Sequence, residues 1–209
     1  MVRTLDCGWA LEEAARGRGA RCVAGVDEAG RGPLFGPVVA AAVILAPGVS
    51  FDGLNDSKKL SAKRRAALDA EIRSRAVSWA IAEVDAATID SINIRRASLA
   101  AMRRAVEQLM PAADYLLIDG CDTIDWHAPQ QAVVRGDGSS FSIAAASVLA
   151  KVHRDRLLEK LDSLFPGYGL ARHKGYPSAA HLAALERLGP TPLHRRSFAP
   201  VARLLGKPH

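Results

Sequence analysis

Two short apolar runs, joined by a turn rich in glycine and proline, constrain the fold of this chain more than any other feature. The first run covers residues 22–26 and ends at Asp27 and Glu28, whereas the second covers residues 38–45 and consists of Val, Ala, Ile and Leu. Between them stand the helix breakers Gly30, Gly32, Pro33, Gly36 and Pro37. We therefore expect a strand, a turn and a second strand that is buried on both faces.

Strands and helices alternate along the remaining chain. Ser61 is the expected N-cap of a helix over residues 61–75, whose inner side carries Ala66, Leu68 and Ile72. Further strands are expected at residues 77–81, 115–118 and 131–134, and further helices at residues 89–110, 139–164 and 179–188. This order predicts a single α/β domain over residues 1–209 with a mixed five-stranded sheet flanked by helices. Residues 165–209 are expected to form a helical extension packed on it.

The charge balance favours a polyanionic partner without naming one. The 209 residues include 28 Lys and Arg against 22 Asp and Glu, which gives a net charge of +6. Aromatic residues make up only 5%, so a surface of stacked rings for single strands is not expected. No apolar run approaches the roughly 18 residues of a membrane helix. Residues 1–21 lack the apolar core of a signal peptide, and the cytoplasm is the expected location.

The cysteine pattern argues against two kinds of cross-link. Cys7, Cys22 and Cys121 are odd in number and form no CxxC pair. A disulfide framework or a zinc site would need such pairing, so we expect buried, reduced thiols.

Acidic residues stand at the ends of two expected strands. Asp27 and Glu28 follow residues 22–26, and Asp119 follows residues 115–118. Ligands of open α/β sheets usually bind at the carboxyl ends of the strands, although an aspartate there can equally well cap a loop. Both sites are followed by glycine within three residues, which favours close approach of a ligand.

A third candidate site lies on the long helix over residues 139–164. Ser147, Lys151 and Asp155 are spaced by four residues and share one face, which is either a solvated stripe or part of a site. Clustering of Asp155 with the strand-end acids would be repulsive unless cations shared the site. Mg²⁺ or Mn²⁺ suits an all-carboxylate set, and two such ions can hydrolyse a phosphodiester.

The glycine turn and the basic segments allow other interpretations. Gly30-Arg31-Gly32 resembles the start of a dinucleotide fingerprint, but that fingerprint must open a helix, and the next expected element is a strand. Lys58 and Lys59 are placed in a loop where they can contact phosphate, whereas residues 63–65 are expected to be a solvated face. Residues 169–177, with His173 and Tyr176, combine rings, charge and glycine. They form either part of a binding surface or an ordinary glycine-rich loop with one buried tyrosine.

Taken together, six separated segments resemble the ribonuclease HII family. They are Val26-Asp27-Glu28-Ala29-Gly30-Arg31-Gly32-Pro33, Asn55-Asp56-Ser57-Lys58-Lys59-Leu60, Ile118-Asp119-Gly120, residues 145–155 with the Ser-Lys-Asp face, His173-Lys174-Gly175-Tyr176-Pro177, and Arg195-Arg196-Ser197-Phe198. The resemblance covers nearly the whole chain, from about residue 23 to 201, although residues 1–21 match none of these segments. It implies a ribonuclease H-like fold and cleavage of RNA in RNA–DNA hybrids. It also implies nicking of duplex DNA on the 5′ side of embedded ribonucleotides, with 3′-hydroxyl and 5′-phosphate products.

The resemblance also implies roles for individual residues. Asp27, Glu28, Asp119 and Asp155 match the four metal-binding catalytic carboxylates of the family, which use Mg²⁺ or Mn²⁺. The turn Gly30-Arg31-Gly32 matches the segment that recognises the ribose 2′-hydroxyl, and Tyr176 matches the tyrosine that stacks at the RNA–DNA junction. The expected substrate-binding set is completed by Lys58, Lys59, Ser147, Lys151 and His173.

Two other functions fit the same sequence features. A non-catalytic nucleic-acid clamp would use the same basic loops, and a DNA-junction resolvase would share the fold class. For the endonuclease we expect a monomer with no obligate protein partner and no contact with a membrane. Residues 204–209 lack the glutamine and aromatic residues of a sliding-clamp motif.

Overall fold

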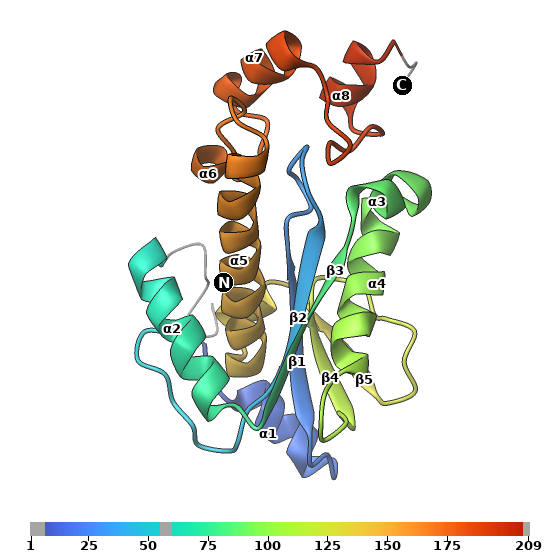
Figure 1. Ribbon diagram of the computed structural model, residues 1–209. Coiled ribbons are helices and arrows are strands. Elements are labelled where there is room, and N and C mark those ends of the chain that lie inside the picture. The colour runs from blue at the N-terminus through green and yellow to red at the C-terminus, as the bar shows by residue number, and fades with distance from the viewer. Residues whose placement is uncertain (1–6, 55–59, 207–209) are drawn as a thin grey trace, which may run out of the picture.

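Five strands form one mixed sheet in the order β3-β2-β1-β4-β5, and the computed structural model describes residues 7–54 and 60–206 around it (Figure 1). The strands are β1 (Val23–Ala29), β2 (Val38–Ile44), β3 (Ser78–Val84), β4 (Tyr115–Asp119) and β5 (Gln130–Val133). β1 pairs antiparallel with β2 and parallel with β4, while β2–β3 is antiparallel and β4–β5 parallel. The expected mixed five-stranded sheet is thus confirmed.

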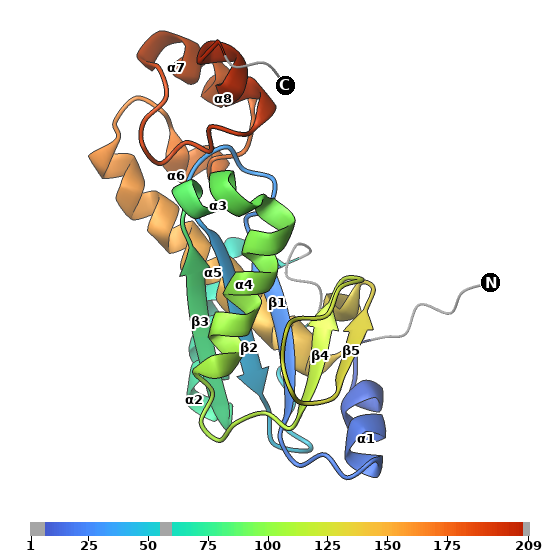
Figure 2. The same cartoon turned by 90° about the vertical axis from the view of Figure 1, so that its right-hand side faces the viewer.

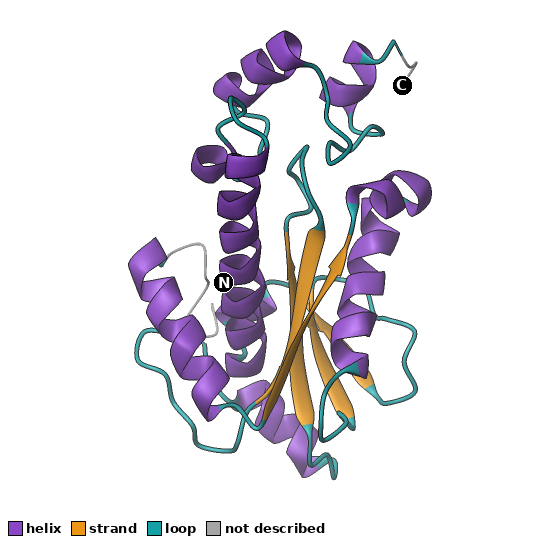
Figure 3. Ribbon diagram, in the orientation of Figure 1, coloured by secondary structure: helices purple, strands orange, loops and turns teal. Residues whose placement is uncertain are grey.

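Helices cover both faces of this sheet (Figure 3). One face carries α3 (Ala86–Ile92) and α4 (Ile94–Glu107), and the other carries α2 (Ala62–Arg75) and the long α5 (Phe141–Leu164). β2 is buried along its whole length, because Val38, Ala40 and Ala42 face α4 while alternate residues such as Val39 and Ala41 face α5. The expectation of a strand buried on both faces is confirmed.

A second group of helices stands at the end of α5, beyond the sheet (Figure 2). It contains α6 (Leu170–His173), α7 (Ala179–Leu188) and α8 (Ala199–Leu204). The turn between β1 and β2 reaches into this group, where Phe35 packs with Leu158 and Leu170, and Leu34 packs with Val201. Main-chain hydrogen bonds from Leu34 to Gly175 and from Arg195 to Leu34, both 2.8 Å, join the two parts.

The helix expected at residues 89–110 is wrong as a single element. Asn93 adopts a left-handed φ of 68°, which ends α3, and its side chain accepts the Arg96 amide at the start of α4. The apolar spacing continues across this break, so periodicity alone joined the two helices. A short helix, α1 (Ala10–Gly17), and the 3₁₀ turn η2 (Gly136–Gly138) were not expected.

Several local expectations are also corrected. Ala66 of α2 is exposed, since it is only two residues from the buried Leu68 and so faces another side of the helix. β1 extends to Ala29, so Asp27 and Glu28 belong to the strand itself rather than following it. β5 begins and ends one residue earlier than expected.

The cysteines are free, as expected, but they are not all buried. Cys7 and Cys22 are half-buried, whereas Cys121 is exposed because it lies in the loop after β4. In the described part of the chain, no helix has the length and apolar character needed to cross a membrane.

Candidate active site

The carboxyl ends of β1 and β4 bring three acidic residues to one edge of the sheet. The strands run parallel with Val26 paired to Ile118, so Asp27 and Asp119 come next at the same level. With Glu28 they line a pocket of about 290 Å³. The residues lining this pocket are Asp27, Glu28, Ala29, Gly30, Arg31, Gly32, Asp119, Ser147, Lys151, Arg154 and Tyr176.

Asp27 is the most deeply buried of the four acids. Only 4% of the residue is exposed, and burial raises the pKa of its carboxyl well above the usual range, with Glu28 and Asp119 adding to the rise. A hydrogen bond with Ser147 and one from the Glu28 amide, 2.7 Å from Oδ1, act against this rise. The pocket therefore holds crowded carboxylates whose charged forms a cation would stabilise.

Glu28 and Asp119 are each held by a donor of their own. Burial raises the pKa of Glu28, and the Arg31 guanidinium, whose Nη1 lies 3.3 Å from Oε1, opposes that shift. The Gly136 amide of η2 donates to Asp119 Oδ1 at 2.7 Å. A Cβ at Gly136 would come within 2.5 Å of the Ile143 side chain, so glycine lets the 3₁₀ turn approach β4 this closely.

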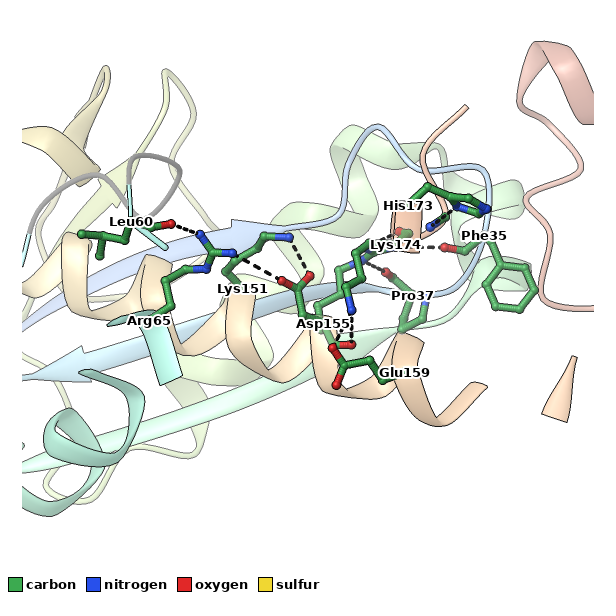
Figure 4. Close-up of polar contacts among 11 residues, drawn as sticks. Phe35, Pro37, Leu60, Arg65, Lys151, Asp155, Glu159, His173 and Lys174 are labelled. Carbon is green, nitrogen blue, oxygen red and sulfur yellow. Dashed lines mark hydrogen bonds and ion pairs between the residues drawn. The ribbon is translucent and has the colours of Figure 1, made fainter. Parts of the chain in front are cut away.

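Asp155 lies beside this pocket rather than among its lining residues. Lys151 Nζ is 2.6 Å from Asp155 Oδ1, and Arg65 of α2 is 3.9 Å from Oδ2 (Figure 4). Ser147 is 5% exposed and Lys151 lines the pocket, so this helix face is not a solvated stripe. Residues 63–65 are likewise not all solvated, because the Arg65 side chain is only 15% exposed and donates to the Leu60 carbonyl.

The side chains at this pocket have the chemistry that a hard divalent ion prefers. Across residues 7–54 and 60–206, no three acidic, histidine or cysteine side chains converge into a ready-made metal cluster. Arg31, Gly136 and Lys151 instead hold separate acids. The donor set nevertheless fits a hard cation, since it offers carboxylate oxygens. Burial and, after it, repulsion by Glu28 and Asp119 raise the pKa of Asp27, and a bound cation would relieve both.

Two buried guanidinium groups hold the turn between β1 and β2 by hydrogen bonds to its main-chain carbonyls. Arg195, fully buried, donates to the carbonyls of Gly30 (2.6 Å), Arg31 (2.9 Å) and Gly36 (2.9 Å). Arg154, 1% exposed, donates to the carbonyls of Phe35 (3.0 Å), Pro37 (3.2 Å) and Lys174 (2.9 Å). Burial lowers the pKa of Arg154 to about 10 and that of Arg195 to about 9, so both stay charged at neutral pH.

Sequence reasoning missed both of these supports. In the sequence, Arg195 stands only within the segment Arg195-Arg196-Ser197-Phe198 that resembles the ribonuclease HII family, and its long-range partners cannot be read from spacing. The sequence does indicate that Arg154 is buried, because Ala150 and Leu158 lie four residues before and after it on the same apolar face of α5. A charged residue on such a stripe needs buried partners.

The remaining candidates divide into those in the pocket and those elsewhere. Tyr176 lines the pocket and is 46% exposed, and a Cβ at Gly32 would lie 3.5 Å from its ring. His173 is not brought to the pocket; its Nε2 contacts the Tyr168 carbonyl at 2.7 Å and its Nδ1 accepts the Gly175 amide. Lys58 and Lys59 lie outside the described residues.

Comparison with known proteins identifies the family. The sequence model of the family described as Ribonuclease HII matches residues 24–201, which is most of the chain. The chain belongs to the ribonuclease HII family. It is accordingly a ribonuclease H, an endonuclease for the RNA of RNA–DNA hybrids, and the family depends on divalent metal ions. Membership decides against the non-catalytic clamp and the junction resolvase.

Bacterial relatives and archaeal structures are both similar to this ribonuclease HII chain. It is 55% identical to the Ribonuclease HII of Solibacter usitatus, over 93% of this chain and 85% of that protein. It is 52% identical to that of Geobacter sulfurreducens, over 95% and 92%. Ribonuclease H2 from Pyrococcus horikoshii matches in structure with a TM-score of 0.75 and 25% identity, over 88% of this chain and 97% of that one. The ribonuclease H-like fold is thereby confirmed.

Proposed function

We propose that this ribonuclease HII also nicks duplex DNA on the 5′ side of an embedded ribonucleotide and leaves 3′-hydroxyl and 5′-phosphate ends. Such a nick would begin the excision of a misplaced ribonucleotide. The observation that supports this proposal is the composition of one pocket, whose lining combines the carboxylates of Asp27, Glu28 and Asp119 with the glycine turn and Tyr176.

The proposed metal ligands are Asp27, Glu28, Asp119 and Asp155, holding two Mg²⁺ or Mn²⁺ ions. When bound, such ions supply a nucleophilic water and stabilise the departing 3′-oxygen. A ribonuclease HIII structure with a TM-score of 0.71 and 19% identity is described as a complex with Mn²⁺. In this chain, Lys151 and Arg65 supply positive charge to Asp155, and Arg31 supplies it to Glu28.

The proposed recognition of ribose depends on the glycine turn. Arg154 and Arg195 hold the carbonyls of the turn, which fixes the direction of its peptide groups at the pocket. Peptide groups of Gly30 and Gly32 can approach a 2′-hydroxyl, the group that distinguishes RNA from DNA. Tyr176 is half exposed on the same pocket and can pack its ring against the adjoining sugar.

The proposed partners are nucleic acids alone. Lys58, Lys59, Ser147 and Lys151 would contact the strands near the pocket, with phosphate contacts adding affinity but no sequence information. A structure of ribonuclease HII from Archaeoglobus fulgidus, with a TM-score of 0.68 and 26% identity, is described as a PCNA complex. Residues 204–209 of this chain lack the glutamine and aromatic residues of a sliding-clamp motif. We also propose a monomer without an obligate protein partner, acting in the cytoplasm.

One assay tests this function directly. The protein is incubated with Mg²⁺ or Mn²⁺ and either a duplex containing one ribonucleotide, an RNA–DNA hybrid or an all-DNA duplex. We expect cleavage of the first two only, and Asp119→Asn should lower it by at least about 100-fold because a ligand charge is lost. The control is Asp125→Asn, since Asp125 is 92% exposed and pairs with Arg103 away from the pocket. Equal cleavage of all-DNA duplex, or full activity of Asp119→Asn, would contradict the proposal.

A further inference from the structure

A chain of buried hydrogen bonds links the C-terminal helices to the main chain of Tyr176. His181 Nδ1 lies 2.9 Å from the Tyr176 carbonyl oxygen, and His181 Nε2 lies 3.3 Å from His194 Nε2. His194 Nδ1 lies 3.0 Å from both the amide nitrogen and the hydroxyl of Thr191. His181 is fully buried and His194 is 1% exposed, and neither side chain has a part in the function proposed so far.

The partners at the two ends determine where the protons lie. A carbonyl oxygen only accepts, so His181 Nδ1 must carry a hydrogen and its Nε2 must be bare. The Thr191 amide only donates, so His194 Nδ1 must be bare and its Nε2 must carry the hydrogen. His194 Nε2–H therefore donates to His181 Nε2, and the two neutral rings form one directed chain. Burial lowers the pKa of both rings, that of His194 to about 4, which keeps them neutral.

Packing fixes the two rings in this arrangement. The His173 ring is stacked on His181, with centroids 4.4 Å apart and an angle of 16° between the planes. Phe35 meets His194 edge to face at 4.9 Å. His173 also accepts the Tyr176 amide on its own carbonyl at 3.0 Å. The main chain on both sides of the Tyr176 side chain is thus tied to this histidine cluster.

We propose that His181 is a positioning residue for Tyr176, and that His194 selects the tautomer of His181 that can perform this role. The inference rests on the proposed part of Tyr176 in recognising the ribonucleotide. A ring that is 46% exposed takes its direction from the main chain that carries it, so the carbonyl held by His181 sets where the ring stands over the pocket. Ribonucleotide recognition then depends on two histidines that never touch the substrate.

Two substitutions of similar size separate the two hydrogen bonds of His181. In His181→Asn the amide NH₂ replaces Nδ1–H and keeps the donor to Tyr176, whereas in His181→Gln the amide replaces Nε2 and loses that donor. We expect His181→Gln to lower kcat/KM on a single-ribonucleotide duplex by about tenfold or more and His181→Asn by about threefold or less. The melting temperatures of both variants are measured alongside. Equal losses in the two variants would overturn the proposal.

A double-mutant cycle shows whether His181 acts through Tyr176. In a Tyr176→Ala background, His181→Gln should change kcat/KM by less than about twofold, because the ring to be positioned is gone. Additive losses would overturn the positioning role.

The tautomers of the two histidines can be measured directly. In the unmodified protein, ¹⁵N spectra of the imidazoles should show the Nδ1–H form of His181 and the Nε2–H form of His194, and the opposite tautomers would also overturn the proposal. Failure of the unmodified protein to nick the single-ribonucleotide duplex would instead refute the proposed function.

Discussion

At the scale of single residues, the buried guanidinium groups of Arg154 and Arg195 donate their hydrogen bonds to main-chain carbonyls rather than to acidic side chains. Arg154 and Arg195 are almost completely buried, and the six hydrogen bonds that they donate end on main-chain carbonyls. A buried cation is costly unless its donors are satisfied, and carbonyl dipoles supply that satisfaction here. The shape of the glycine turn at the pocket therefore depends on residues more than 100 positions later in the chain.

Replacement of Arg195 tests this dependence. Arg195→Lys keeps the charge but cannot reach the carbonyls of Gly30, Arg31 and Gly36 together, because an ammonium lacks the planar fork of a guanidinium. We expect the free energy of unfolding, measured by urea denaturation, to fall by about 2–4 kcal/mol. The neighbouring exposed Arg196 provides the control, and Arg196→Lys should change it by less than about 0.5 kcal/mol. Equal effects of the two substitutions would contradict the prediction.

The two kinds of site residue differ in how far the sequence predicts them. The placement of Asp27, Glu28 and Asp119 follows from a local rule, since parallel strands carry their final residues to one edge of a sheet. The buried position of Arg195 cannot be predicted from the neighbouring sequence, because its hydrogen-bond partners lie in a turn more than 150 positions earlier in the chain. Asp155 is intermediate: its helix face was predicted, but its contact with Arg65 depends on how α2 packs against α5.

At the scale of elements, β1 and α5 approach each other more closely than any side chain would allow. A Cβ on Gly25 would lie 2.1 Å from the carbonyl carbon of Ser142, at the start of α5. This contact brings the face of α5 that carries Ser147 to the strand that carries Asp27. Glu12 of α1 fixes the same end of α5, since its carboxylate accepts the Ser142 amide at 2.9 Å and the Ser140 hydroxyl at 2.7 Å.

Gly25→Ala is the substitution that tests this packing. The methyl group meets backbone that cannot rotate away, so α5 must shift and the free energy of unfolding should fall by about 3 kcal/mol or more. Urea denaturation provides the measurement. Gly17→Ala in α1 is the control, because nothing lies within 4 Å of its Cβ, and it should be neutral or stabilising by up to about 1 kcal/mol. A Gly25→Ala protein as stable as Gly17→Ala would refute the close approach.

Periodicity predicted most elements, but not the places where the chain departs from it. The apolar alternation and helical spacing found the five strands and the central helices. The break at Asn93 was missed since Ile92 and Leu99 lie on either side of it and both pack against the same core. The short α1 was missed although Ala10–Gly17 consists almost entirely of strong helix formers. Its position in the fold could not be predicted, because it is set by contacts of Glu12 with residues about 130 positions away.

At the scale of the whole molecule, the C-terminal helices and the sheet share their hydrogen bonds. The amides of Leu34 and Gly36 donate to Gly175 and Leu193, at 2.8 and 2.9 Å, and Arg195 donates back to Leu34. Two apolar clusters, around Phe35 and Leu34, contain residues from both parts. If residues 165–209 are an extension of one domain, as predicted, they cannot open without exposing this shared interior.

Native-state hydrogen exchange tests the prediction of a single unit. The amides of Leu34, Gly36 and Arg195 should exchange only through global unfolding, with the same free energy as the amides of β2. The Gly19 amide, which donates to Arg16 in the turn after α1, serves as an internal control and should exchange much faster. Exchange of the three linking amides at a clearly lower free energy than β2 would mean that the C-terminal helices open as a separate unit.

The stability of the whole molecule should also depend on pH through His194. Burial lowers the pKa of His194 to about 4, whereas an unfolded histidine titrates near about 6.5. Between these two pH values, His194 is protonated in the unfolded chain but neutral in the folded protein. The free energy of unfolding therefore falls as the pH is lowered, by up to about 1.4 kcal/mol per pH unit. Urea denaturation from pH 7.5 to 4.5 measures this slope. In His194→Gln, which keeps a donor toward His181 but cannot titrate, the slope should flatten, and an unchanged slope would show that His194 titrates normally in the folded protein.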